Sequence, residues 1–101
     1  MCGNYRNKRL LEVVRKLPCQ NCGADDSTIC AAHSNWSEDG KGMGIKSSDA
    51  AIAALCYNCH SALDQGSKLS KIERKELWTN AYKNTFKSLI ENEYLIVNSK
   101  L

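Results

Sequence analysis

The sequence has one proline, one phenylalanine and two histidines in 101 residues, and it lacks a long apolar run. The longest aliphatic stretch, residues 50–55, is mostly alanine and is far shorter than the roughly 18–20 residues that cross a bilayer. The first six residues lead into charged positions rather than an apolar segment, which argues against a secretory signal. We therefore expect a cytoplasmic protein that does not associate with membranes.

Composition and charge are those of a small globular protein. Hydrophobic residues make up 43% of the chain and charged residues 25%, which is too apolar for a disordered segment. Residues 1–18 carry a net charge of +4, residues 19–67 a net −4 and residues 68–101 a net +3. Two basic flanks around an acidic centre suit a central cation and a polyanion at the edges. The same pattern is also typical of solvated helix surfaces.

Apolar spacing predicts the elements of the first half of the chain. Residues 5–17 are predicted to form a helix that Pro18 ends. Residues 28–34 and 50–55 are predicted to be strands, although alanine favours helix in isolation. A glycine-rich loop over residues 35–48 is expected to join them.

The second half of the chain is predicted to be mainly helical. A short helix over residues 58–65 is expected to end at Gly66. Ser70 and Glu73 match a capping box, which predicts a long helix that continues to about Asn92.

The long helix carries an apolar face that we expect to pack in the core. Its members are Trp78, Ala81, Tyr82, Phe86, Leu89 and Ile90. After this helix, residues 94–97 are predicted to form a short final strand.

Four of the six cysteines form two C-x-x-C pairs, Cys19 with Cys22 and Cys56 with Cys59. A two-residue spacer lets both sulfurs of a pair reach one tetrahedral Zn²⁺, and four thiolates close the coordination shell, so a structural zinc is predicted. A redox pair and plain buried thiols are the alternatives, but a redox C-x-x-C uses one such motif in a βαβ context that is absent here. Cys30 is expected to be a small core residue.

The two histidines stand in informative places. His60 follows the second cysteine pair, and Asp64 lies four residues later on the same helix face. These two groups can hold a divalent cation that water and phosphate complete, which suits Mg²⁺ or Mn²⁺. His33 ends the first predicted strand, and a histidine beside a metal-bound phosphate can act as a general base. Taken singly, each residue is also compatible with a purely structural role.

Taken together, these residues resemble the zinc-bearing HNH endonucleases, whose core is the ββα-metal (His-Me finger) fold. The resemblance covers residues 19–66 and is closer to small phage and prophage HNH proteins of the YbcO type. The segment has a C-x-x-C pair, a strand that ends in Ala32-His33, a glycine-rich loop, and the motif L-C-x-x-C-H-x-x-x-D. As in those proteins, an aspartate, Asp49, lies seven residues before the third cysteine of the set, Cys56.

The resemblance implies a role for each matching residue. His33 corresponds to the general base of the family. His60 and Asp64 correspond to the helix positions that bind the catalytic metal. The four cysteines of the two pairs correspond to the structural zinc ligands.

This sequence departs from the HNH pattern at two positions. Ala32 stands where many HNH enzymes have a metal-ligating Asp or His, which leaves the cation one ligand fewer. Ala51 stands where the middle asparagine usually lies, and Asp49 is the nearest polar residue that could orient His33.

We therefore predict a single α+β domain over residues 1–101. It consists of a helix over 1–18, the zinc knuckles and ββα-metal core over 19–66, and a helix with a short strand over 67–101. The predicted function is metal-dependent hydrolysis of DNA phosphodiesters, with Zn²⁺ as a structural ion and Mg²⁺ or Mn²⁺ as the catalytic ion.

DNA is the predicted partner, and phage or host recombination proteins are further candidates. Lys41 and Lys46, together with the basic flanks, are expected to contact backbone phosphates. Two alternatives remain open. One is a degenerate HNH module that binds DNA without turnover, which Ala32 favours. The other is a protein-interaction module that uses the aromatic face of the long helix.

Overall fold

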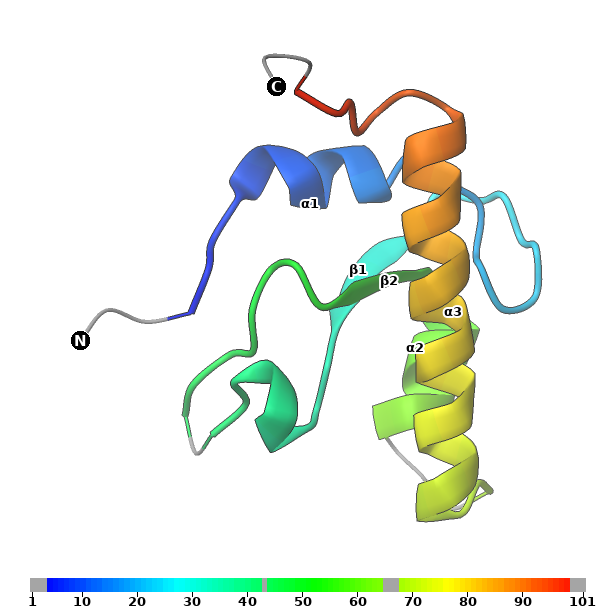
Figure 1. The fold of residues 1–101 in the computed structure, drawn as a ribbon. Coiled ribbons are helices and arrows are strands. Elements are labelled where there is room, and N and C mark those ends of the chain that lie inside the picture. Colours follow the sequence, from blue (N-terminus) through cyan, green and yellow to red (C-terminus); the bar gives the residue numbers. More distant parts are fainter. Residues whose placement is uncertain (1–3, 43, 65–67, 99–101) are drawn as a thin grey trace.

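Two short antiparallel strands lie at the centre of the structure, and three helices of the described chain pack around them (Figure 1). The computed structural model describes residues 4–42, 44–64 and 68–98. In chain order the elements are α1 (Lys8–Val14), β1 (Cys30–His33), the 3-10 helix η1 (Ser37–Asp39), β2 (Ile52–Leu55), α2 (Tyr57–Asp64) and α3 (Lys71–Glu91). The predicted α+β class is therefore confirmed.

The two strands pair over their full length, with Cys30 opposite Leu55 and His33 opposite Ile52. All four residues of β2 are buried. Helix propensity favours alanine by only a fraction of a kcal/mol per residue, so the burial of both faces decides the outcome and the segment becomes a strand. Both predicted strands are confirmed, with shorter bounds than the sequence suggested.

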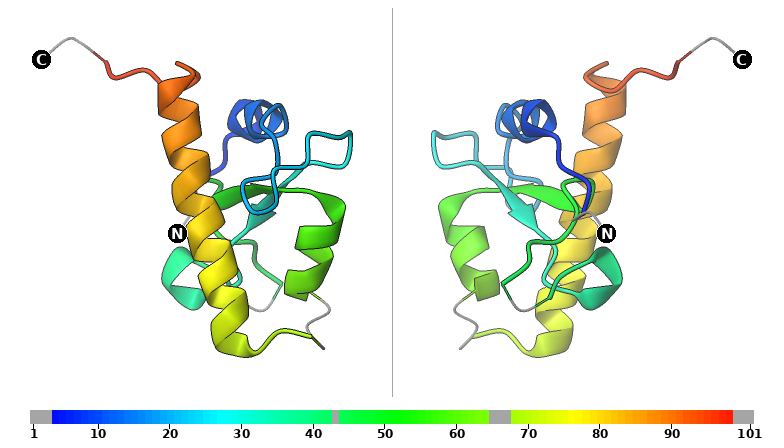
Figure 2. Two further views of the ribbon diagram at one scale, coloured as in Figure 1. Left: turned by 90° about the vertical axis from the view of Figure 1, so that its right-hand side faces the viewer. Right: turned by 90° about the vertical axis from the view of Figure 1, so that its left-hand side faces the viewer.

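Helix α3 packs against β2, and α2 lies on the other side of the hairpin (Figure 2). Two side chains of α3 hydrogen-bond to the strands. Trp78 donates its Nε1–H to the carbonyl of Ala32 at 2.9 Å, and the hydroxyl of Thr85 accepts the backbone N–H of Ala54 at 3.0 Å. Thr85 also donates to the carbonyl of Ala81 at 2.7 Å. These contacts fix α3 relative to the strands that carry the candidate site.

The core lies between the hairpin, α1 and α3, and much of it is alanine and leucine. The buried apolar side chains are Val14, Leu17, Cys19, Ile29, Ala32, Ala51, Ile52, Ala53, Ala54, Leu55, Cys56, Leu63, Trp78, Ala81 and Leu89. Such a small core supplies limited stability, so a chain of this size benefits from a covalent or metal cross-link.

The predicted start of α3 is confirmed in detail. Ser70 is the N-cap, its side chain accepts the N–H of Glu73, and the Glu73 carboxylate accepts the N–H of Ser70 at 2.8 Å. The helix ends at Glu91 with Asn92 as its C-cap, as the sequence predicted.

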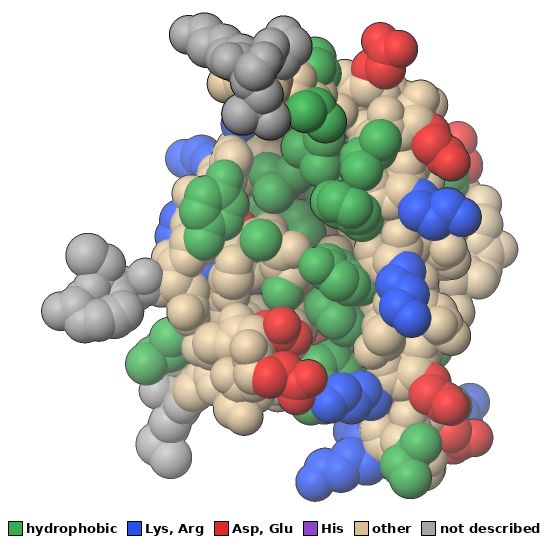
Figure 3. Space-filling view, viewed as in Figure 1, with side chains coloured by type: hydrophobic (Ala, Val, Ile, Leu, Met, Phe, Trp, Pro, Cys, Tyr) green, Lys and Arg blue, Asp and Glu red, His purple; other side chains and the backbone are tan. Residues whose placement is uncertain are grey.

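The predicted apolar face of α3 is only partly correct. Trp78 and Leu89 are buried, whereas Phe86 is 52% exposed and Ile90 is 47% exposed. Thr85 takes the inward position instead, because its hydroxyl satisfies a backbone N–H of β2. Apolar side chains gather on the surface beside α3 (Figure 3), where a shallow pocket of about 100 Å³ lies between α1 and α3.

The predicted strand over residues 94–97 is wrong. The chain turns at Glu93, which has a positive φ of 62°, and the N–H groups of Tyr94 and Leu95 return to the carbonyl of Leu89. Ile96 and Val97 are 84% exposed, so no neighbouring strand supports an extended segment there.

Helix α1 runs from Lys8 to Val14, rather than from residue 5 to residue 17 as predicted. Asn7 is its N-cap and accepts the N–H of Leu10 at 3.0 Å. The segment before it is held by side-chain contacts: Asn4 donates to the carbonyls of Gly40 at 2.8 Å and Lys46 at 2.9 Å. Gly40 has a φ of 93° and faces the Asn4 amide so closely that a Cβ would clash with it.

Helix α2 follows β2 directly and begins one residue earlier than predicted. Its Leu63 is buried in the core, which leaves its other face toward solvent. The predicted last residue, Gln65, and the predicted terminator, Gly66, lie outside the described residues.

Candidate metal centre and histidine sites

The two C-x-x-C pairs come together at one end of the hairpin. The sulfur atoms of Cys19, Cys22, Cys56 and Cys59 all lie within 4.8 Å of one another, and the sulfurs of Cys22 and Cys56 are 3.7 Å apart. A tetrahedron with Zn–S bonds of about 2.3 Å has sulfur–sulfur distances of about 3.8 Å. The four cysteines are therefore positioned to hold a metal ion, and their geometry is compatible with structural zinc.

The first pair sits on a tight turn that docks onto β2. The N–H of Cys19 donates to the carbonyl of Ala24 at 2.7 Å, and the N–H of Gln20 donates to the carbonyl of Ala54 at 2.8 Å. Gly23 follows the pair with a φ of 82°, a conformation that glycine adopts without steric cost. The second pair lies at the start of α2, so the cluster joins the turn before β1 to the start of α2.

The surroundings of Cys19 and Cys59 shift the pKa values of their thiols in opposite directions. Burial raises the pKa of Cys19, but hydrogen bonds from the backbone N–H groups of Cys22, Cys56 and Asn21 outweigh burial and lower it to about 6. Burial and the neighbouring thiols raise the pKa of Cys59 to about 12, although the Asn21 amide opposes this shift. Four thiolates this close repel one another unless a cation lies between them, so this donor set fits a soft divalent metal.

The cysteine cluster is the only group of three or more His, Cys, Asp or Glu side chains within the described ranges that is arranged to hold a metal. The predicted pair, His60 and Asp64, lies elsewhere on α2. Its imidazole Nε2 is 3.4 Å from the Asp64 Oδ2, and both side chains are substantially exposed. This pair offers two ligands at most, which leaves the other positions of a hard cation to water or phosphate oxygen.

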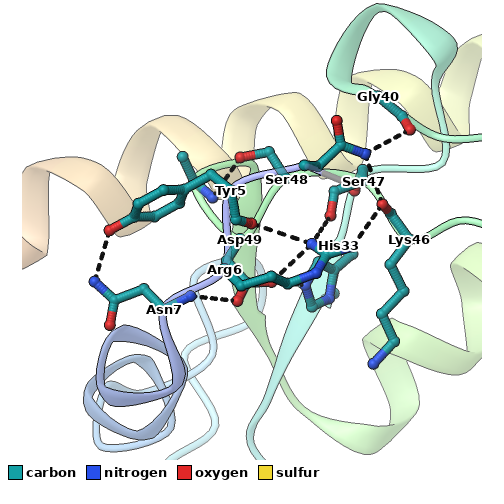
Figure 4. Close-up of polar contacts among 12 residues, drawn as sticks. Tyr5, Arg6, Asn7, His33, Gly40, Lys46, Ser47, Ser48 and Asp49 are labelled. Carbon is teal, nitrogen blue, oxygen red and sulfur yellow. Dashed lines mark hydrogen bonds and ion pairs between the residues drawn. The ribbon is translucent and has the colours of Figure 1, made fainter. Parts of the chain in front are cut away.

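His33 and Asp49 meet where β1 ends (Figure 4). The imidazole Nε2 of His33 lies 2.7 Å from the Asp49 Oδ1. The second oxygen of Asp49 accepts the N–H of Asn7 at 2.7 Å, and the Arg6 guanidinium lies 3.3 Å from Oδ1. Only 4% of the Asp49 side chain is exposed, whereas 19% of the His33 side chain is.

The Asp49 carboxylate is stabilised in its charged form. Burial raises its pKa, but the hydrogen bonds from His33 and Asn7 and the charges of His33 and Arg6 outweigh burial and hold the pKa below the usual aspartate value. An ionised carboxylate only accepts hydrogen bonds, so His33 donates from Nε2. The lone pair of the neutral imidazole is then on Nδ1, the atom that can take a proton.

Arg6 attaches the N-terminal segment to the loop before β2 (Figure 4). Its Nη1 donates to the carbonyl of Ser47 at 2.6 Å, and its Nη2 donates to the carbonyl of Lys46 at 2.9 Å. The backbone N–H of Asp49 in turn donates to the carbonyl of Tyr5 at 2.9 Å. This role of Arg6 was not predictable from the sequence, because residues 5–7 were expected to be helical and no pattern links them to a loop about forty residues away.

Cys30 is not the core residue that was expected. It is only partly buried, and its sulfur lies 3.2 Å from the His60 Nδ1 and 3.4 Å from the carbonyl of Leu55. Burial raises the pKa of this thiol. The sequence carried no signal for this contact, because it depends on how α2 packs against the start of β1.

The structure does not link the two histidine sites through any hydrogen bond or ion pair among the described residues. His33 contacts Asp49, and His60 contacts Asp64 and Cys30. Lys41 and Lys46, the predicted phosphate ligands, are both exposed on the loop between the strands.

No helix in the described parts of the chain is both long and apolar enough to cross a membrane. Comparison with known protein families, with curated proteins and with solved structures finds no match for this chain.

Proposed function

We propose that this protein is a metal-dependent nuclease of the HNH class that hydrolyses DNA phosphodiester bonds. One arrangement carries the proposal. A histidine held by a buried aspartate ends β1, and the helix that follows β2 presents His60 with Asp64. The hairpin and helix are joined at a four-cysteine cluster. This order of strand, strand and helix, with these residues at these places, supports the assignment of a ββα-metal core.

His33 is the general base in this proposal. Its Nε2–H is engaged by Asp49, so the Nδ1 lone pair takes the proton from a water molecule. The water oxygen bonds to phosphorus, the bond from phosphorus to the 3′ oxygen breaks, and the 3′ oxygen gains a proton from solvent. The buried Asp49 carboxylate stabilises the imidazolium that forms, as a carboxylate does in other His–Asp pairs.

His60 and Asp64 would hold the catalytic Mg²⁺ or Mn²⁺. Such an ion, when bound, stabilises negative charge on the phosphate and on the leaving oxygen. A two-residue ligand set is weak, so we expect activity only at high metal concentration. The four cysteines would hold a structural Zn²⁺, and Lys41 and Lys46 would contact backbone phosphates.

One observation favours a second candidate, a module that binds DNA without cleaving it. Ala32 is 1% exposed and its carbonyl accepts the Trp78 indole N–H, so this position offers no ligand to a cation. Such a protein would keep the cysteine cluster and the exposed Lys41 and Lys46 and would lack turnover. The aromatic face of α3 is a weaker candidate for protein contacts, because Trp78 is buried.

Nicking of supercoiled plasmid, followed with Mg²⁺, with Mn²⁺ and with EDTA, tests the proposal. His33→Gln is the matched variant, because its amide N–H can still donate to Asp49 but its side chain has no basic nitrogen. We expect cleavage to fall roughly 10²–10⁴-fold, which is the usual contribution of a general base. Metal content, thermal unfolding and DNA affinity should match those of the wild type.

Asp64→Ala separates the metal ligand from the base. Because one anionic ligand is lost, this variant should need more Mn²⁺ for half-maximal cleavage, while its fold is kept since Asp64 is exposed. Wild-type cleavage by His33→Gln would show that the mechanism is wrong. Wild-type protein that binds DNA but never cleaves it would favour the non-catalytic module.

A further inference from the structure

A pocket of about 320 Å³ with apolar and cationic lining lies where three segments meet: the chain after β1, the end of α2 and the start of α3. Its lining residues are Asn35, Trp36, Ser37, Leu63, Lys71 and Arg74. Cavities of this size accept small ligands or parts of larger ones. The mechanism proposed above uses none of these side chains.

The pocket has an excess of positive charge. Neither Lys71 nor Arg74 makes a side-chain hydrogen bond or ion pair with another described residue, and the buried Arg74 Nε has no hydrogen-bond partner among these residues either. Glu38 lies beside the pocket, but its carboxylate is paired with Lys75 at 3.1 Å. A buried donor without an acceptor is destabilising, so an oxyanion at this position would be favourable.

An aromatic wall faces the same space. Trp36 packs against Trp78 with ring centroids 5.4 Å apart, and the Lys75 ammonium lies 5.5 Å from the Trp36 ring centroid. These contacts hold the indole in place, while the residue stays only partly buried. Two cationic side chains next to a fixed indole match a nucleotide, which offers an anionic phosphate and a flat base.

Two residues that line the pocket are sequence neighbours of the proposed catalytic residues. Asn35 lies two residues after His33, which places their Cα atoms within about 7 Å of each other. Leu63 directly precedes Asp64. We propose that this pocket binds the nucleotide next to the scissile phosphodiester, with its phosphate on Lys71 and Arg74 and its base or sugar against Trp36. This inference rests on the proposed function, because it names part of the substrate site.

The test compares two double variants in binding to a short DNA duplex of mixed sequence. Lys71→Ala with Arg74→Ala removes the pocket cations. Lys83→Ala with Lys87→Ala removes the same charge from exposed positions of the same helix, Lys83 being about 18 Å further along it than Lys71. We expect the pocket variant to lose about tenfold in affinity and to lower the salt slope by about 1–2, with a smaller loss for the control.

Tryptophan fluorescence gives a second readout. DNA binding should change the emission of the wild type, and Trp36→Phe should remove most of this change, because Trp78 is only 4% exposed. The pocket proposal would be overturned if the two double variants lost affinity equally. It would also be overturned if Trp36→Phe showed the same change in emission on DNA binding as the wild type.

The outcomes separate this inference from the proposed function. If plasmid cleavage depends on His33 but the pocket variant binds and cleaves as the wild type does, the pocket proposal fails and the nuclease stands. If the pocket variant loses affinity as expected but the wild type never cleaves, the pocket is a DNA-binding site and the nuclease proposal fails.

Discussion

The Asp49 carboxylate orients His33 through a hydrogen bond to its imidazole. Three segments of the chain meet at this carboxylate. The hairpin register explains half of this arrangement, since Asp49 lies three residues before Ile52, the partner of His33. The other half comes from Asn7 and Arg6, which precede α1. A buried carboxylate with this many donors contributes to stability as well as to chemistry.

Replacement of Asp49 should make the free energy of unfolding vary less with pH in the acid range. Because the folded pKa of Asp49 lies below its unfolded value of about 3.9, the carboxylate stabilises the fold above that pH, and this contribution disappears as the pH falls through the folded pKa. We expect Asp49→Asn to lower the free energy of unfolding by about 1–3 kcal/mol near neutral pH. The difference from the wild type should shrink below about pH 4. Urea unfolding across this pH range measures it.

Asp25→Asn is the control for this prediction, since Asp25 is exposed and makes no side-chain hydrogen bond with another described residue. It should leave stability nearly unchanged at every pH. A constant difference between Asp49→Asn and the wild type from neutral to acid pH would show that the charge of Asp49 is not what stabilises the fold.

At the residue scale, local chemistry was predictable and long-range packing was not. The spacing of the cysteines predicted the four-cysteine cluster, because two sulfurs of a C-x-x-C pair can reach one ion whatever surrounds them. The contact of Cys30 with His60 and the contacts of Arg6 depend on the docking of distant segments, and no periodic pattern encodes such docking.

At the scale of the elements, too, local patterns were predictable and long-range packing was not. The start of α3 was predictable because the capping box of Ser70 and Glu73 is a local hydrogen-bond pattern. The inward position of Thr85 on α3 was not predictable. Hydrophobic periodicity favours Phe86 over Thr85 for a buried position, because it considers only the hydrophobicity of the side chains. Thr85 is buried instead because the backbone N–H of Ala54 needs an acceptor in the core. The threonine hydroxyl is such an acceptor, and phenylalanine has none.

Thr85→Val tests this explanation for the packing of α3. Valine keeps the shape of threonine but removes the acceptor of the Ala54 N–H and the donor to Ala81, and Thr85 is 1% exposed. We expect the free energy of unfolding to fall by about 1–3 kcal/mol, the cost of a buried unpaired polar group. Thr79→Val, on the same helix, is the control and should change stability little. Equal effects of the two substitutions in urea unfolding would contradict the explanation.

At the scale of the whole molecule, the cysteine cluster joins parts of the chain that are far apart in sequence. Cys19 and Cys22 follow α1, whereas Cys56 directly precedes α2 and Cys59 lies in its first turn. A metal bound there would close a loop that contains β1 and β2, and so would hold together the hairpin that carries His33 and the helix that carries His60. The same ion would therefore support both halves of the proposed catalytic site without taking part in the chemistry.

Loss of the metal should therefore unfold much of the protein. We expect purified protein to contain one zinc per chain, and we expect Cys56→Ser to lose this zinc together with most of its far-UV helical signal. Structural zinc contributes about 10–16 kcal/mol in small zinc domains at neutral pH, which is as large as the total stability of a typical domain, about 5–15 kcal/mol. Cys30→Ser is the matched control, because Cys30 lies outside the cluster and its substitution should leave the zinc in place. Protein that is folded but contains no metal by elemental analysis would refute this role, and so would a folded Cys56→Ser variant.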